Sequence, residues 1–136
     1  MKRIGAAAAV VALVLSAPAL DAYLKLGTRV GANLVPLHWT AFPIRYFVTN
    51  RDVAGVTAPQ LQQAVASGLS TWAAVPGVSI SSQFVGFTGA NPASGDGMTV
   101  IGFQNRPDLD RVLGSTSFTF DSLTGEVIES DRKSVV

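Results

Sequence analysis

The spacing of apolar residues predicts one helix and five strands, and the helix between residues 57 and 77 has the clearest pattern. Thr57 and Gln60 have the spacing of a capping box, in which side chains and backbone cap the first helical turn reciprocally. Pro76-Gly77 then ends the helix. Between these signals, apolar and small residues recur at helical spacing and predict one apolar stripe, formed by Leu61, Ala64, Val65, Gly68, Leu69 and Trp72.

Alternating polar and apolar residues predict strands on both sides of this helix. Residues 43–50 place Ile44, Tyr46 and Val48 on one face, and residues 78–87 continue an alternating pattern after the helix. Three more strands are predicted further along the chain, at residues 98–103, 111–120 and 126–130. The segments between them, residues 88–97, 104–110 and 121–125, have the composition of loops and turns.

This order predicts an α+β fold, a mixed and twisted five-stranded sheet with one long helix on one face. A single helix between the first two strands favours a parallel pair, and the tight turn before the last strand makes the last two strands antiparallel. The apolar run at 98–103 suits a strand buried on both faces. Nothing in the sequence is expected to cover the sheet face opposite the helix.

The first 19 residues have the three-part layout of a secretory signal peptide. Lys2 and Arg3 precede an apolar run, Ile4 to Leu15, and Ala17-Pro18-Ala19 supplies small residues for cleavage. The run is shorter than the ~20 apolar residues that a membrane span needs. We therefore expect a secreted or periplasmic protein, with no membrane contact after cleavage and an irregular N-terminal arm at residues 20–42.

Composition excludes several classes of function. The 136 residues contain no cysteine, which excludes disulfides, thiolate metal sites and a cysteine nucleophile. The formal net charge is only +1, and two of the basic residues belong to the predicted signal, so we expect no nucleic-acid partner.

Several segments taken together resemble the N-terminal portion of a bacterial matrixin-type catalytic domain, within the metzincin zinc endopeptidases. They are YLKLG, HW, PIRYFVTN, the helix QLQQAVASGLSTWAAVPGVSI, DGMTVIGF, VLGSTSFTF and TGEVIESD, in this order between residues 23 and 131. The resemblance implies hydrolysis of peptide bonds by one zinc ion, which three histidines of an HExxHxxGxxH helix would hold. It also implies that residues 43–131 are a partial metallopeptidase domain acting on a peptide or protein substrate.

The residues that would hold this zinc are missing from the sequence. His38 is its one histidine, no HExxH occurs, and residues 132–136 depart from the family's pattern as an off-pattern tail. We therefore expect no catalytic residue and no zinc ligand in this chain, and expect the chain to be inactive by itself. A frameshift, a premature stop or a wrongly assigned gene end would leave such a pattern.

Other polar residues have interpretations that need no chemistry. His38, beside Trp39, is typical of a packing or surface residue, because a catalytic histidine needs an oriented partner. Loop acids could join backbone carbonyls around a calcium ion, but turn residues are favoured because no spacing matches a calcium loop. These acids are Asp96, Asp108, Asp110 and Asp121. Glu126, Glu129 and Asp131 could be paired catalytic carboxylates, and alternation along a strand favours solvent-facing charges instead.

One surface keeps a functional interpretation. By resemblance, Leu113, Gly114, Ser115, Thr116 and Ser117 occupy an edge strand above the cleft, where an extended substrate pairs through main-chain hydrogen bonds. Gly114 removes a side chain where another backbone could approach. No G-x-S-x-G elbow surrounds the hydroxyls, so a serine nucleophile is excluded. The alternatives to an exported zinc endopeptidase are a secreted peptide-binding module that uses this edge, and an inhibitory fragment that docks on an intact peptidase.

Overall fold

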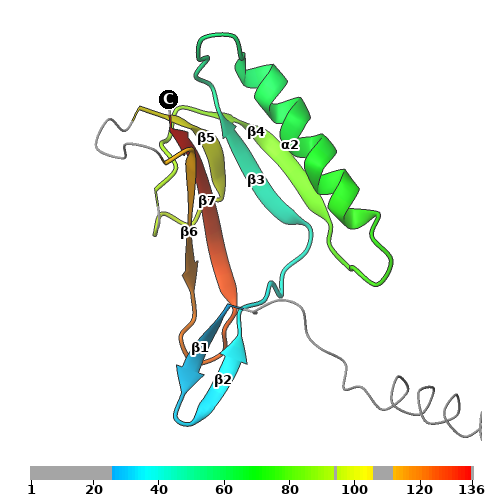
Figure 1. Ribbon diagram of the computed structural model, residues 1–136, viewed down its shortest axis with the longest axis vertical. Helices are drawn as coiled ribbons and strands as arrows, with labels where there is room; N and C mark the ends of the chain where they lie inside the picture. Colours follow the sequence, from blue (N-terminus) through cyan, green and yellow to red (C-terminus); the bar gives the residue numbers. More distant parts are fainter. Residues whose placement is uncertain (1–25, 94, 106–111, 136) are drawn as a thin grey trace, which may run out of the picture.

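The computed structural model of the protein describes residues 26–93, 95–105 and 112–135 (Figure 1). The predicted signal peptide, residues 1–19, lies outside the described residues, as do Asp108 and Asp110. The elements in chain order are β1 (Gly27–Val30), β2 (Asn33–Pro36), β3 (Ile44–Thr49), α2 (Ala58–Ala73), β4 (Ser82–Thr88), β5 (Val100–Gln104), β6 (Gly114–Phe120) and β7 (Val127–Val135).

The predicted α+β fold is confirmed, with a mixed five-stranded sheet and one helix. The strand order is β4-β3-β5-β7-β6, in which β3 is parallel to both β4 and β5, and β5 is parallel to β7. The predicted tight turn makes β6 and β7 antiparallel. Helix α2 connects the parallel strands β3 and β4 and lies against this half of the sheet, away from β6 (Figure 1).

Helix α2 begins as predicted, but only part of the predicted stripe faces the sheet. The Thr57 side chain accepts the Gln60 N–H, and the Gln60 side chain accepts the Thr57 N–H, so both halves of the capping box are present. Leu61, Val65 and Leu69 are half-buried. The other members of the predicted stripe, Ala64, Gly68 and Trp72, are exposed. The helix therefore turns its Leu61, Val65 and Leu69 row toward β3 and β4, the strands that it contacts.

The predicted irregular arm contains a hairpin instead. Strands β1 and β2 pair antiparallel around a two-residue turn, and Gly31 in this turn has a φ of 62°, the left-handed conformation that such turns require. The hairpin docks on the turn between β6 and β7, where the Thr28 hydroxyl donates to the Ser122 carbonyl at 3.2 Å. Beyond the hairpin, the His38 N–H donates to the Gly125 carbonyl at 3.0 Å, and His38 forms an isolated parallel bridge with Glu126 just before β7.

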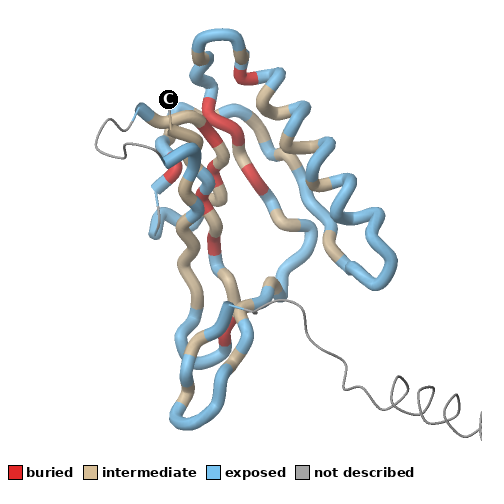
Figure 2. Tube along the Cα trace, viewed as in Figure 1, coloured by how far each residue is buried: buried red, intermediate tan, exposed pale blue. Residues whose placement is uncertain are grey.

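The prediction that nothing covers the sheet face opposite the helix is wrong for the part over β5 and β7, where Val100, Glu129 and Asp131 are buried. The connection between β4 and β5 covers this part, because Gly95 and Gly97 donate their N–H groups to the Glu129 side chain. Pro92 in the same connection is fully buried. Val100 on β5 and Asp131 on β7 have no exposed surface, and Figure 2 shows buried stretches within the sheet between exposed loops. The core is therefore small, and part of it is polar.

Strand β7 also runs past the predicted break at Asp131. Residues Arg132 to Val135 pair in continuous register with Ile101 to Gln104 of β5, and Arg132 to Ser134 also pair with β6. This segment therefore lies between two partner strands in the sheet. The sequence did not indicate this because Arg132-Lys133-Ser134 carries no apolar alternation.

Candidate functional site

The predicted peptide-binding segment lies on an edge strand. Gly114, Ser115, Thr116 and Ser117 are the first residues of β6, and Leu113 precedes them with 90% of its surface exposed. Strand β6 pairs with β7 on one side and ends the sheet on the other (Figure 1). A row of main-chain groups therefore faces away from the sheet along the whole strand.

The register shows which residues of β6 present these groups. The Val135 N–H donates to the Leu113 carbonyl at 3.1 Å, which makes this a hydrogen-bonded pair of the antiparallel ladder. Because such pairs alternate, Ser115, Ser117 and Thr119 also direct their main-chain groups toward β7. The open edge is consequently formed by the N–H and C=O groups of the intervening residues, Gly114, Thr116 and Phe118.

Gly114 has a structural reason of its own. A Cβ added there would lie 3.2 Å from the Lys133 carbonyl oxygen on β7, closer than ordinary van der Waals contact. The glycine therefore permits close pairing inside the sheet, and the approach of a peptide from outside is not needed to explain it.

Behind this edge, the structure brings together two buried carboxylates, contrary to the predicted solvent-facing charges. Glu129 is 1% exposed and Asp131 has no exposed surface. The Glu129 carboxylate accepts the N–H groups of Gly95 and Gly97, and also the Thr119 hydroxyl at 2.9 Å. Burial by itself would raise the pKa of Glu129, but these hydrogen bonds outweigh burial and hold the pKa below its ordinary value.

Asp131 is satisfied on one oxygen only. Its Oδ1 accepts the Val100 N–H at 2.9 Å, while its Oδ2 is buried with no hydrogen-bond partner among the described residues. Ser117 lies directly opposite on β6, and its hydroxyl is buried without a partner as well. Burial, aided by the charge of nearby Glu129, raises the pKa of Asp131. Because neither carboxylate reaches the surface, neither can act on a substrate as the structure stands.

The remaining candidates hold structural positions. Asp96 accepts the Met98 N–H at 2.9 Å, and Asp121 accepts the N–H groups of Leu123 and Thr124, so both have the turn role that the sequence favoured. The two hydrogen bonds lower the pKa of Asp121. His38 is exposed, with its Nδ1 3.0 Å from the Pro36 carbonyl oxygen.

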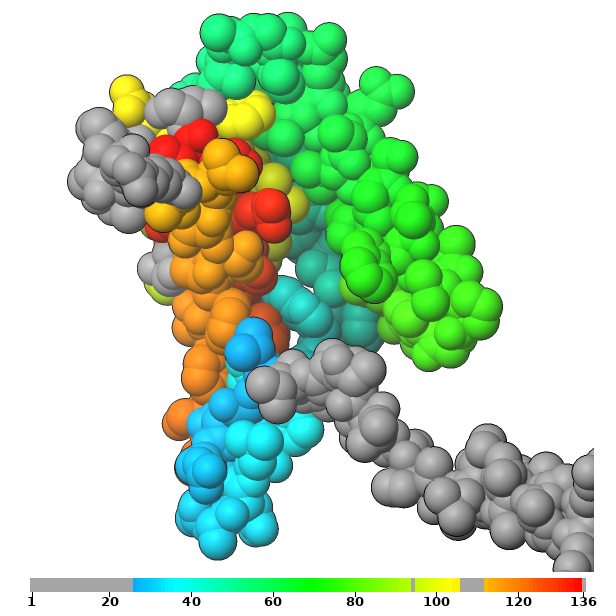
Figure 3. Space-filling model, viewed as in Figure 1, coloured from blue at the N-terminus to red at the C-terminus, as the bar shows by residue number. Residues whose placement is uncertain are grey.

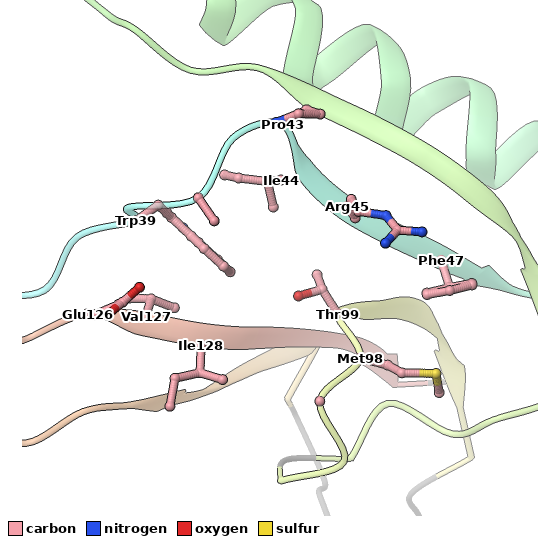
Figure 4. Close-up of a pocket in the computed structure, with 12 residues that line it drawn as sticks. Trp39, Pro43, Ile44, Arg45, Phe47, Met98, Thr99, Glu126, Val127 and Ile128 are labelled. Carbon is pink, nitrogen blue, oxygen red and sulfur yellow. The ribbon is translucent and has the colours of Figure 1, made fainter.

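Glu126 is half-buried and accepts the Thr40 hydroxyl. It lies on the wall of a cavity of about 610 Å³ that the sequence did not indicate. Strand β5 begins only at Val100, opposite Phe47, so no strand lies between the first residues of β3 and of β7. In Figure 3 the surface is open at this place, and in Figure 4 Trp39 and Ile44 point into the space.

Across the described ranges, no three histidine, aspartate or glutamate side chains come together as a group that could hold a metal ion. Within the same ranges, no helix is long and apolar enough to cross a bilayer. Comparison of the whole chain with family models, with curated proteins and with solved structures gives no significant match.

Proposed function

We propose that this chain binds an extended peptide along the open edge of β6, as the substrate-binding part of an exported zinc endopeptidase of the matrixin type. The observation that carries the proposal is the position of the predicted segment. Of the strands in the five-stranded sheet, the one named by the resemblance is an edge strand, and three of its residues direct their main-chain groups to the side where no described strand pairs with it.

Strand addition explains how such an edge would select a ligand. A peptide aligned with β6 would exchange hydrogen bonds with Gly114, Thr116 and Phe118, and these bonds depend on backbone and not on side-chain identity. Phe118 is half-buried and has its ring 6.0 Å from that of Phe120, so an apolar side chain of the peptide could pack beside this pair. We therefore expect broad recognition of extended peptides, with a preference for an apolar residue near Phe118.

The zinc part of the proposal does not fit the residues of this chain. A set of three imidazole ligands cannot come from a sequence with one histidine, and His38 is an exposed residue of the arm. The zinc ligands and the general base would have to be supplied by residues other than these 136. The chain by itself would therefore bind peptide without cleaving it.

A second candidate function, a non-catalytic secreted module that binds peptides at the same edge, is favoured by this lack of ligands. Zinc titration of the purified chain separates a complete metallopeptidase site from both candidates. We expect an affinity no tighter than micromolar, as for a single imidazole, because tight zinc sites need three or four protein ligands. Sub-micromolar zinc binding, or metal-dependent proteolysis by the chain, would show that the ligand assignment is wrong.

The edge itself is tested by replacing Thr116 with proline. Proline removes the outward N–H of an edge strand but leaves the N–H groups that pair with β7, so the sheet should persist. With fluorescein-labelled peptides selected from a random decapeptide library, Thr116→Pro should weaken binding by about tenfold, and Thr116→Ala should not. If circular dichroism shows that both variants are folded and they bind the peptide equally well, the edge of β6 is not part of the binding site.

A further inference from the structure

The cavity between β3 and β7 has features of a small-molecule site. Its volume of about 610 Å³ lies within the range typical of ligand pockets. Most of its wall is aromatic or aliphatic, and Trp39, Ile44, Phe47, Met98 and Val127 contribute side chains from four different segments of the chain. The cavity arises because β5 is shorter than its neighbours, so it belongs to the framework of the sheet.

Some polar side chains on the wall have hydrogen-bond partners within the protein, and Arg45 has none among the described residues. Glu126 accepts the Thr40 hydroxyl, and the Thr99 hydroxyl accepts the Ser130 N–H at 3.1 Å. Arg45 is exposed and makes no ion pair or side-chain hydrogen bond with any residue that the structure describes. The cavity wall therefore carries one positive charge, at Arg45, with no ion-pair partner among the described residues, and one negative charge, at Glu126 on the opposite side of the apolar interior (Figure 4).

The main chain of Arg45 adds a second donor. The Ile44 N–H donates to the main-chain carbonyl of Ser81 on the β4 side. The Phe47 N–H donates to the main-chain carbonyl of Thr99 on the β5 side. Since main-chain groups alternate along a strand, the Arg45 N–H points to the β5 side, where β5 has not yet begun. An acceptor in the cavity could thus meet the N–H and the guanidinium of the same residue.

We propose that this cavity binds a small organic anion, a molecule with an aromatic or branched aliphatic body and one carboxylate or sulfonate group. The apolar wall buries the body, and Arg45 receives the anionic group through charge-assisted hydrogen bonds. This site is independent of peptide binding at β6, because none of the cavity residues belongs to that strand.

The test uses 1-anilinonaphthalene-8-sulfonate, an aromatic anion whose fluorescence rises on binding, with the full chain. We expect one saturable site per chain. Arg45→Gln should weaken binding about fivefold, the effect of a charge that solvent partly screens. Trp39→Ala should weaken it more by removing a large part of the apolar wall. Arg132→Gln and Trp72→Ala, at exposed positions outside the cavity, are the matched controls and should leave the affinity unchanged.

A neutral analogue of the dye distinguishes recognition of the anionic group from non-specific hydrophobic binding. N-phenyl-1-naphthylamine lacks the sulfonate. Its affinity for the unmodified chain should be about fivefold weaker than that of the anionic dye, and Arg45→Gln should leave this affinity unchanged. The proposal is overturned if the anionic dye binds at several sites with equal affinity for Arg45→Gln and the unmodified chain. It is also overturned if the dye shows no saturable binding to the unmodified chain.

Discussion

Helix α2 and strand β7 are held in the fold by different kinds of interaction. The helix rests on β3 and β4 through a half-buried row, and Ala58 is its one buried residue. Strand β7, by contrast, carries two buried carboxylates. The side chains of Glu129 and Asp131 have almost no surface exposed to solvent. The contrast teaches that an apolar pattern does not guarantee burial and that a charged pattern does not exclude it. What decides is whether a packing surface, or a set of N–H donors, is available at that place.

The largest effect is expected at Glu129. Glu129→Ala would leave the Gly95 and Gly97 N–H groups without their acceptor, and should lower the free energy of unfolding by about 3 kcal/mol or more. Urea denaturation followed by circular dichroism measures this change. Glu126→Ala is the matched control, since Glu126 is half-buried and accepts one hydroxyl, and it should cost about 1 kcal/mol or less. Equal losses would contradict the special role of Glu129.

The two buried carboxylates should respond in opposite directions when their charge is removed. Glu129→Gln replaces an acceptor with a donor opposite an N–H, and should destabilise the fold by about 2 kcal/mol. Asp131→Asn keeps the acceptor for Val100 and removes a poorly satisfied charge, so it should be neutral or stabilise by about 1 kcal/mol at pH 7. Thermal unfolding of both variants at pH 7 compares them, and a large loss for Asp131→Asn would show that its charge is needed.

The same pair predicts a pH dependence with opposing signs. The lowered pKa of Glu129 gives stability that is present above its ordinary value of 4.5 and is lost as the pH falls through the lowered pKa. The raised pKa of Asp131 gives a penalty that appears as the pH rises from 3.8 through the raised value. Unfolding free energies between pH 2 and 7 should therefore fall less steeply in acid for Glu129→Gln. A profile identical to that of the unmodified chain would contradict the assignment.

The smallest effect is expected on the outer side of α2. Trp72 is 66% exposed, so Trp72→Ala should change the free energy of unfolding by about 0.5 kcal/mol or less. Leu69→Ala, on the half-buried row that faces Tyr46 and Phe84, should cost about 1–2 kcal/mol. Urea denaturation of the two variants side by side gives the comparison. A larger loss at Trp72 than at Leu69 would mean that the helix packs through the side of the predicted stripe that contains Ala64, Gly68 and Trp72.

Local signals explain which parts of the fold the sequence predicted. The capping box of Thr57 and Gln60 and the turn at residues 121–125 are short-range patterns, and both elements formed as expected. The edge position of β6 followed from the resemblance to a family, since strand order depends on contacts between residues far apart in the chain.

The parts that the sequence did not predict depend on partners distant in sequence. Glu129 is buried because Gly95 and Gly97, more than 30 residues earlier, donate their N–H groups to it. The arm around Val30 formed a hairpin because Gly31 allowed a tight turn and the β6–β7 turn offered a surface to dock on. The cavity results from the late start of β5 at Val100. No residue type in the sequence predicts where along β3 this strand begins to pair.

The central claim is that β6 offers its outer main chain to a peptide, and amide hydrogen exchange tests it most directly. In the free chain, the Thr116 and Phe118 amides should exchange quickly, while those of Ser115 and Ser117 should be protected by β7. Saturation with a bound peptide should slow exchange at Thr116 and Phe118 and leave Ser115 and Ser117 unchanged. Protection of Thr116 and Phe118 without peptide, or no change on adding a peptide known to bind, would contradict the account.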